Sequence, residues 1–262
     1  MGVHVNESMA MPPPTSADPQ TAKPVKAYKN PDFLMGEEAR AIRILCEYLE
    51  PETRFRQHKV RRAIIFFGSA RLCPKPPSGP DYCSLASDLA EKLAHWTKRE
   101  HAPEKRFYFC SGSGPGIMEA AASGVARVDR GLNIGLNISL PFEQHINRHV
   151  TQEMAFEFHY FFMRKFWFMN LAEAMVVFPG GFGTLDELFE MLTLVQTGKA
   201  KPMPFVLFGR EFWNDAVNFE ALAKRGLISR ADLDLIFLAD TVDEAYGHLT
   251  SRLKKVSGDV SP

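Results

Sequence analysis

Three short apolar runs in this sequence end in a glycine-containing turn, and a stretch with helical spacing follows each of them. The third copy is the clearest: residues 174–178 (AMVVF) lead into PGGFGT at 179–184, and 185–196 has amphipathic helical spacing. The other two copies end at Gly68 and at the glycine-rich loop 112–116. Apolar strands that alternate with helices form a parallel sheet covered on both faces. We therefore expect an α/β fold with a doubly wound, mostly parallel sheet.

The same patterns predict the order of the elements and the domain limits. The expected strands are 63–68, 107–110, 133–140, 154–162, 174–178, 205–208 and 237–238. The expected helices are 37–49, 82–98, 117–127, 163–171, 185–196, 212–224 and 241–254. Residues 1–29 are rich in Pro, Ala, Ser and Thr, and we expect a disordered tail. An N-terminal helix that ends near Pro51 and a basic connector fill 30–61, the nucleotide-binding catalytic domain fills 62–255, and 256–262 is a tail.

The composition argues against several classes of partner. Lysine and arginine total 31, as do aspartate and glutamate, so no strong basic field favours nucleic acid. No apolar run reaches 18 residues and the N-terminus has no hydrophobic signal core, so neither a membrane span nor secretion is expected. The four cysteines lack metal-ligand spacing, and Cys110, at the end of an apolar run, is read as a buried thiol. We expect a protein of the reducing cytoplasm, without a metal site.

The turn at 179–184 has the properties of an anion-binding site. Glycine allows close backbone approach, and the free N–H groups at the start of a helix favour a phosphate. Thr184 is placed either to cap the helix or to bond a phosphate oxygen, and Glu187 puts a carboxylate one turn farther on. The alternative is an ordinary strand-to-helix turn with a capping Thr and a Glu at the third helical position.

Two further segments carry possible ligand contacts. The loop at 112–116 has GxGxG spacing instead of GxGxxG, which disfavours a complete NAD site, and neither loop has the lysine of an ATP-binding GxxxxGK[ST] motif. Arg164 and Lys165 stand where an extended stretch becomes a helix, and adjacent cations there can bind a phosphate, a base or a leaving group. Two solvated charges at the start of a helix are the equally favoured alternative.

Taken together, four motifs resemble the LOG (lonely guy) family, whose members are often described as lysine decarboxylases. They are GSAR at 68–71, GSGPGIMEA at 112–120, Arg164-Lys165, and PGGFGTLDE at 179–187. The resemblance covers about 62–253. It implies a Rossmann-like fold and hydrolysis of nucleoside 5′-monophosphates, such as AMP and cytokinin riboside monophosphates, to a free base and ribose 5-phosphate.

The resemblance also assigns residues to roles. Arg164 and Glu187 look like the catalytic pair. The residues that look like substrate contacts are Gly68, Ser69, Gly112, Gly114, Met118, Glu143, Lys165, Gly180, Gly181, Phe182, Gly183, Thr184, Asp186 and Thr193. The chain departs from the family at Ser113, where many members have glycine, and at 161–163, where Phe-Phe-Met replaces Met-His-x. The second departure makes AMP a better expected substrate than a cytokinin nucleotide.

Three function classes follow. The first is the phosphoribohydrolase, with no cofactor, acting as a homodimer or higher homo-oligomer with sites near the subunit interface. The second is a non-catalytic carrier of a nucleotide or a molybdenum cofactor on the same fold. The third is a pyridoxal-phosphate decarboxylase, which needs a Schiff-base lysine, and no lysine here has a readable cofactor context. Because both Arg164 and Glu187 are present, the enzyme is the leading prediction.

Overall fold

The structure is a computed structural model that describes residues 23–73, 79–140 and 145–256, without the side chains of the last two. The chain divides into two compact units, residues 1–43 and 44–262. The described part of the first unit contains two 3₁₀ turns, the short helix α1 (Pro31–Met35) and the beginning of α2 (Arg40–Gln57). The Asn30 side chain accepts a hydrogen bond from the backbone N–H of Asp32, so it caps α1.

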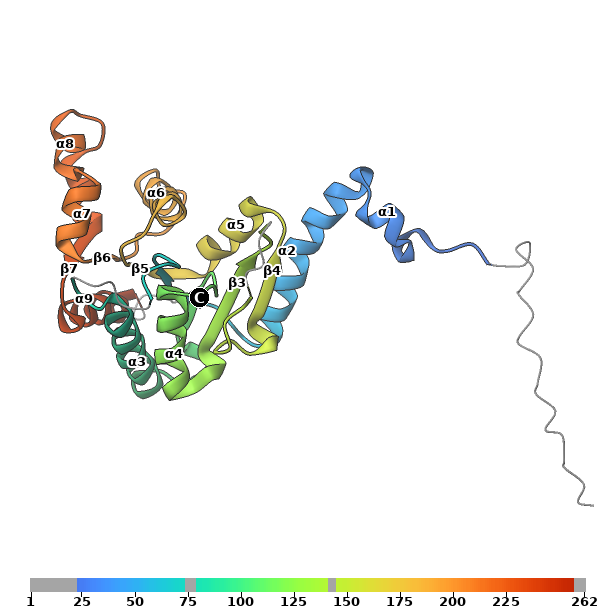
Figure 1. The fold of residues 1–262 in the computed structure, drawn as a ribbon, viewed down its shortest axis with the longest axis horizontal. Coiled ribbons are helices and arrows are strands. Elements are labelled where there is room, and N and C mark those ends of the chain that lie inside the picture. The colour runs from blue at the N-terminus through green and yellow to red at the C-terminus, as the bar shows by residue number, and fades with distance from the viewer. Residues whose placement is uncertain (1–22, 74–78, 141–144, 257–262) are drawn as a thin grey trace, which may run out of the picture. The chain divides into compact units, whose positions relative to one another are not determined.

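Seven parallel strands form the sheet of the second unit (Figure 1). They are β1 (Ala63–Phe67), β2 (Tyr108–Ser111), β3 (Asn133–Ile138), β4 (Ala155–Phe158), β5 (Ala172–Val177), β6 (Phe205–Phe208) and β7 (Ile236–Ala239). Their order is β4-β3-β2-β1-β5-β6-β7, so the chain builds outward from β1 in one direction and then returns to add β5 on the other side of β1. This is the doubly wound, Rossmann-like order, and the strand order reverses between β1 and β5.

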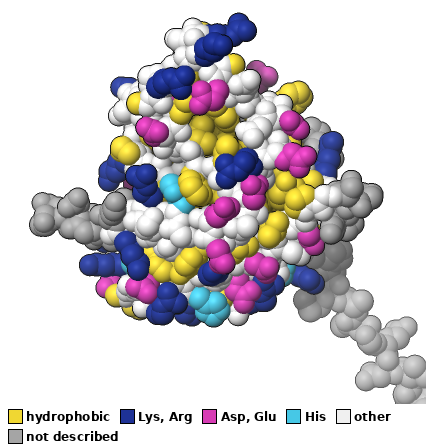
Figure 2. All heavy atoms as spheres, turned by 90° about the vertical axis from the view of Figure 1, so that its left-hand side faces the viewer, with side chains coloured by type: hydrophobic (Ala, Val, Ile, Leu, Met, Phe, Trp, Pro, Cys, Tyr) yellow, Lys and Arg dark blue, Asp and Glu magenta, His cyan; other side chains and the backbone are white. Residues whose placement is uncertain are grey.

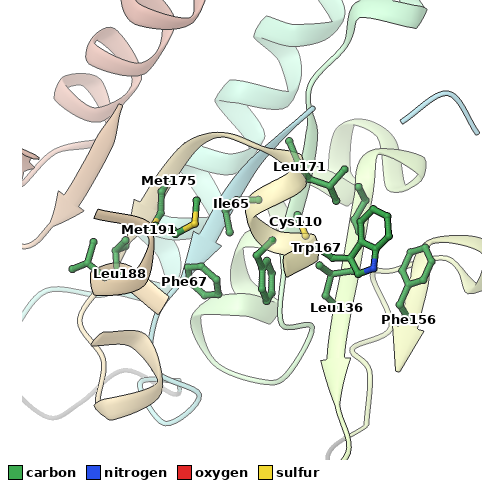
Figure 3. Close-up of a cluster of buried hydrophobic side chains, with 14 of the residues drawn as sticks. Ile65, Phe67, Cys110, Leu136, Phe156, Trp167, Leu171, Met175, Leu188 and Met191 are labelled. Atoms are coloured by element: carbon green, nitrogen blue, oxygen red, sulfur yellow. The ribbon is translucent and has the colours of Figure 1, made fainter. Parts of the chain in front are cut away.

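Helices cover both faces of this sheet, as expected. They are α3 (Tyr82–Glu100), α4 (Ile117–Asp129), α5 (Phe161–Leu171), α6 (Phe182–Gln196), α7 (Arg210–Ala216), α8 (Phe219–Lys224) and α9 (Val242–Val256). Alternate residues of β1 enter opposite cores: Ile64 packs with α3, α4 and α9, whereas Ile65 packs with α5 and α6. Figure 3 shows the second core, in which Leu188 and Met191 attach α6 to the sheet beside Met175.

The predicted end of the N-terminal helix near Pro51 is wrong, because α2 continues to Gln57. Proline lacks the N–H that would bond the carbonyl four residues earlier, and an unbonded carbonyl inside a helix is costly. Here that carbonyl belongs to Glu47, and it accepts a hydrogen bond of 2.9 Å from the Trp167 indole N–H. The aromatic ring of Phe55, one turn after the proline, lies 4.7 Å from that of Phe156 on β4. Packing against the sheet therefore maintains the helix beyond Pro51.

Two other expected elements change at their ends. The extended stretch predicted for 154–162 ends at Phe158, and α5 begins at Phe161, because the Glu47 carboxylate accepts hydrogen bonds from the backbone N–H groups of His159 and Tyr160. The single helix predicted for 212–224 is divided into α7 and α8. It divides there because the Asn218 side chain caps α8 by accepting from the Ala221 N–H.

The four cysteines differ in their pairing. Cys73 and Cys83 form a disulfide, which the cysteine spacing did not predict. Cys110 is buried and unpaired, as predicted, and Cys46 is exposed. Within the described residues, no helix has both the length and the apolar character needed to cross a membrane. On the face shown in Figure 2, basic and acidic side chains are interspersed.

Candidate functional site

A cavity of about 630 Å³ opens where the strand order reverses, beyond the carboxyl ends of β1 and β5. Ligands of open parallel sheets bind at this position because two neighbouring strand-to-helix loops separate there. The lining comes from the three glycine-bearing loops, the first turns of α4, α5 and α6, and the end of β3 with the residues that follow it. The residues that line it are Phe67, Gly68, Ser69, Ala70, Arg71, Gly112, Met118, Ile138, Leu140, Phe161, Arg164, Gly181, Phe182, Gly183, Thr184, Leu185 and Glu187.

The loop after β1 is held directly against the neighbouring loops. The Ser69 N–H donates to the Pro179 carbonyl at 3.0 Å, and the Ser69 carbonyl accepts from the Ile117 N–H at 3.2 Å. Gly68 leaves no room for a side chain, because an added Cβ would lie 2.7 Å from the Ile117 side chain. These contacts join the ends of β1 and β5 and the start of α4 into one rigid edge of the cavity.

The start of α6 forms a second edge of the cavity. Its N-cap is Gly181, which has no side chain to bond the first N–H groups of the helix. A Cβ added at Gly181 or Gly183 would meet no atom within 4 Å, so the backbone here faces open space. Thr184 is not the N-cap but a buried residue of the helix, packed against Gly180. An uncapped helix start of this kind attracts an anion.

A buried ion pair lies below this helix start. Arg164 Nη2 is 3.1 Å from Glu187 Oε1, and the side chains are 14% and 5% exposed. Burial raises the pKa of Glu187 to about 7, although the positive charge of Arg164 opposes the shift. A carboxyl group that exchanges its proton near neutral pH is suited to general acid–base catalysis. Burial likewise raises the pKa of the Cys110 thiol beside this pair, so that sulfur is a neutral, inert neighbour.

Contacts on both sides position the Arg164 side chain. Gly112 lies below it: a Cβ at that glycine would be 3.8 Å from Arg164 Nη1 and only 3.0 Å from the Met118 sulfur. The Phe161 ring lies above it, 5.3 Å from the guanidinium carbon. The Glu47 carboxylate accepts hydrogen bonds from the backbone N–H groups of His159 and Tyr160, directly ahead of α5, so the helix that carries Arg164 is tied to α2.

A second hollow of about 550 Å³ adjoins the cavity on the other side of α6. Lys165 lines it, and its Nζ lies 2.8 Å from both Asp186 and Glu190. Burial alone lowers the pKa of Lys165, but the bonds to the two carboxylates outweigh burial and raise it above its ordinary value. Phe182, which is 94% exposed, stands between the two hollows.

The structure therefore divides the predicted site residues into groups. Those that line the cavity are Gly68, Ser69, Gly112, Met118, Arg164, Gly181, Phe182, Gly183, Thr184 and Glu187. Lys165, Asp186 and Thr193 line the adjoining hollow, which they share with Phe182. Gly114 and Gly180 lie in the loops but do not line the cavity. Glu143 falls outside the described residues.

Two notable lining residues, Arg71 and Phe161, were not among the predicted substrate contacts. Arg71 is the last residue of the GSAR turn, and a cation three residues after a strand-end glycine was a usable signal. Phe161 belongs to the segment read as extended, so its place on the first turn of α5 was hidden. Among the described residues, no group of three His, Cys, Asp or Glu side chains could hold a metal ion.

Comparison with known proteins agrees with this architecture. The model of the family described as possible lysine decarboxylase matches residues 118–249, half of the chain. The molybdenum cofactor binding protein from the phototrophic bacterium Rippkaea orientalis has a similar solved structure, with 18% sequence identity and a TM-score of 0.50. The alignment covers 74% of this chain and 98% of that one, and at this identity it shows the fold alone. No match was found among curated protein sequences. The chain belongs to the family described as possible lysine decarboxylases, which includes the LOG proteins.

Proposed function

We propose that the protein hydrolyses the N-glycosidic bond of purine nucleoside 5′-monophosphates, releasing a free base and ribose 5-phosphate. The observation that carries this proposal is the Glu187 carboxyl group, 5% exposed and with a pKa of about 7, at the edge of a cavity that also presents an uncapped helix start. The first group suits proton transfer and the second suits a phosphate. A nucleoside monophosphate needs both.

The chemistry makes specific demands on these groups. Water adds to C1′ as the C1′–N9 bond breaks, the bonding electrons leave with the base, and the base takes up one proton. The ribose acquires oxocarbenium character, which a nearby carboxylate stabilises. Ionised Glu187 can provide that charge and accept a proton from the water, and Arg164 can stabilise negative charge on the departing base. The 3.1 Å ion pair keeps the two groups together before substrate binds.

The walls of the cavity suit a flat aromatic base. Met118, Ile138, Leu140 and Phe161 supply apolar surface, and half of the Phe161 side chain is exposed. An exposed aromatic ring is a stacking platform for a purine. We propose AMP as the preferred substrate, ahead of a cytokinin riboside monophosphate, because Phe-Phe-Met at 161–163 departs from the family pattern.

The activity named in the family description finds less support in these residues. A pyridoxal-phosphate decarboxylase needs a lysine amine that is uncharged when it forms its Schiff base. Among the described residues no lysine lines the cavity, and Lys165 lines the adjoining hollow, where two carboxylates raise its pKa. It is therefore held as an ammonium ion, which is a poor nucleophile.

A non-catalytic carrier of a nucleotide or of a molybdenum cofactor is the second candidate. The observation that favours it is the ion pair itself: Glu187 already bonds Arg164, so one of the two groups must change partner before it acts on a substrate. A carrier needs no such change.

Adenine release from AMP by the purified protein distinguishes these candidates. We expect free adenine and ribose 5-phosphate in equal amounts, with no carbon dioxide from lysine in the presence of pyridoxal phosphate. Glu187→Gln is the matched control, because it preserves the shape of the side chain and removes its charge. AMP that binds but stays intact would favour the carrier.

We also propose that the active form is a homodimer or a larger homo-oligomer. Phe161 and Phe162 are each about half exposed, and Phe182 is 94% exposed, all beside or near the cavity. Exposed aromatic side chains that cluster in this way are typical of protein interfaces. Sedimentation of the purified protein measures the mass: a monomer at assay concentration would contradict the proposal.

A further inference from the structure

The charged side chains around the cavity do not balance. Among the described lining residues, only Arg71, Arg164 and Glu187 are charged. Arg164 and Glu187 form the buried pair at 3.1 Å and offset each other. Arg71 therefore leaves the described lining with one surplus positive charge, on the same cavity as the start of α6.

The Arg71 guanidinium is available to a ligand. The residue is exposed, and among the described residues its side chain forms no ion pair or hydrogen bond. Lys165, the other cation that sequence reasoning placed at the site, bonds Asp186 and Glu190 and lines the adjoining hollow instead. Of the three cations considered, Arg71 alone has no carboxylate partner within the described chain.

The backbone around Arg71 holds it close to the start of α6. The Arg71 N–H donates to Ser69 Oγ at 3.0 Å, and the Ser69 N–H donates to the Pro179 carbonyl, just ahead of the helix. Gly116 comes so close to the backbone of Ser69 and Ala70 that it leaves no room for a side chain. The Cys73–Cys83 disulfide ties the chain two residues beyond Arg71 to α3. Because the segment is attached at Ser69 and again at Cys73, the Arg71 side chain can reach only a limited region.

We propose that Arg71 recognises the phosphate group of the substrate and so makes the site selective for nucleoside monophosphates over nucleosides. The proposal rests on the proposed function. A guanidinium donates two parallel N–H groups to a phosphate, and the free N–H groups of α6 approach the same dianion from the other side of the cavity. Arg164 and Glu187 are then left for the ribose and the base.

Calorimetry with ribose 5-phosphate tests this without any need for catalysis. Losing a charge-assisted hydrogen bond of this type weakens binding on the order of tenfold to a hundredfold, so we expect Arg71→Ala to raise the Kd by that factor. Arg71→Lys should recover part of the loss, because the charge remains and the two-pronged geometry does not. Arg61→Ala is the matched control: it removes an exposed arginine at the opposite end of β1 and should leave the Kd unchanged.

Steady-state assays supply the second measurement. Arg71→Ala should raise KM for AMP by the same factor while kcat stays within a few-fold of the parent protein, and it should lower the preference for AMP over adenosine. Melting temperatures of all variants establish that they fold, which the exposure of Arg71 leads us to expect.

The outcomes separate the two proposals. Adenine release with an unchanged KM in Arg71→Ala would overturn the role of Arg71 and leave the proposed function intact. Weaker ribose 5-phosphate binding in Arg71→Ala, with no hydrolysis by the parent protein, would support Arg71 and overturn the proposed function. If the parent protein binds neither AMP nor ribose 5-phosphate, both proposals fall.

Discussion

Two ion pairs join the same two helices and have different surroundings. Arg164 on α5 meets Glu187 on α6, and the next residue, Lys165, meets Asp186, the residue before Glu187. The Arg164–Glu187 side chains are 14% and 5% exposed, whereas Asp186 is 56% exposed. Successive residues of a helix point about 100° apart. The two adjacent residues of α5, and likewise the two of α6, therefore point in different directions, and the two ion pairs lie on different sides of α6.

The difference in burial decides what each pair can do. Removal from water raises the pKa of Glu187 to about 7 and makes the carboxyl group responsive near neutral pH. Asp186 stays in contact with water, and Asp186 and Glu190 together hold Lys165 as an ammonium ion. The Arg164–Glu187 pair therefore has properties suited to catalysis, whereas the Lys165–Asp186 pair is a surface contact that joins α5 to α6.

The largest expected effect separates the two acidic residues. Glu187→Gln should lower kcat for AMP on the order of a hundredfold or more, because a charge that stabilises the transition state is lost. Asp186→Asn should change kcat by no more than about fivefold, because an exposed ion pair contributes about 1 kcal/mol or less. Adenine release by both variants measures the contrast. Equal losses would mean that the two carboxylates act as one unit.

Exchange of the two cations is the second test. Arg164→Lys should reduce kcat/KM on the order of tenfold or more, because an ammonium ion cannot reproduce the planar guanidinium that bonds Glu187 through Nη2. Lys165→Arg should leave kcat/KM nearly unchanged, since any cation can bond Asp186 and Glu190 in that position. Kinetics of the two single variants, with melting temperatures alongside, provide the comparison. Full activity in Arg164→Lys would show that only the charge matters there.

The pH dependence tests the difference in pKa. If ionised Glu187 is the active form, kcat/KM for AMP should fall about tenfold for each pH unit below 7. The phosphate of AMP also takes up a proton near pH 6, so the profile of Glu187→Gln is needed to isolate that contribution. In this variant, kcat/KM should change with pH only through protonation of the AMP phosphate. A parent rate that instead falls as pH rises through 7 would make protonated Glu187 the active form.

Most of the fold was predictable because its signals are local. The apolar runs and the glycine turns identified all seven strands, and with them the parallel sheet. The continuation of α2 past Pro51 was not predictable, because the carbonyl that the proline leaves free is bonded by Trp167, far along the chain. Helix ends set by such distant partners have no signal in the neighbouring residues.

The site followed the same rule. Arg164, Glu187 and the turn at 181–184 were identified from motifs, and they line one cavity. Lys165 was grouped with Arg164 because the two are adjacent in sequence, whereas helical geometry turns them toward different hollows. Arg71 ends the GSAR motif, but the role proposed for it depends on the charge balance of the assembled cavity, which the motif alone does not show.

The smallest expected effect concerns the stability that the Lys165 contacts provide. Lys165→Met keeps most of the alkyl stem and removes the charge, so it isolates the ion pairs with Asp186 and Glu190. Since the pKa of Lys165 is raised in the folded state, its contribution is complete below pH 10.5, the ordinary value, and is lost as pH rises through the folded-state value. At pH 7 we expect the free energy of unfolding to fall by about 1 kcal/mol or less.

Urea denaturation at low and high salt measures that change. Salt should reduce the difference between parent and variant, because partly exposed charges are screened. A double-mutant cycle with Glu190→Gln gives the coupling free energy, which should be below about 1 kcal/mol. A coupling of several kcal/mol that persists in high salt would show that this pair is as well isolated from water as Arg164 and Glu187. Burial would then not explain why the Arg164–Glu187 pair and the Lys165 pairs differ in their expected effects on catalysis.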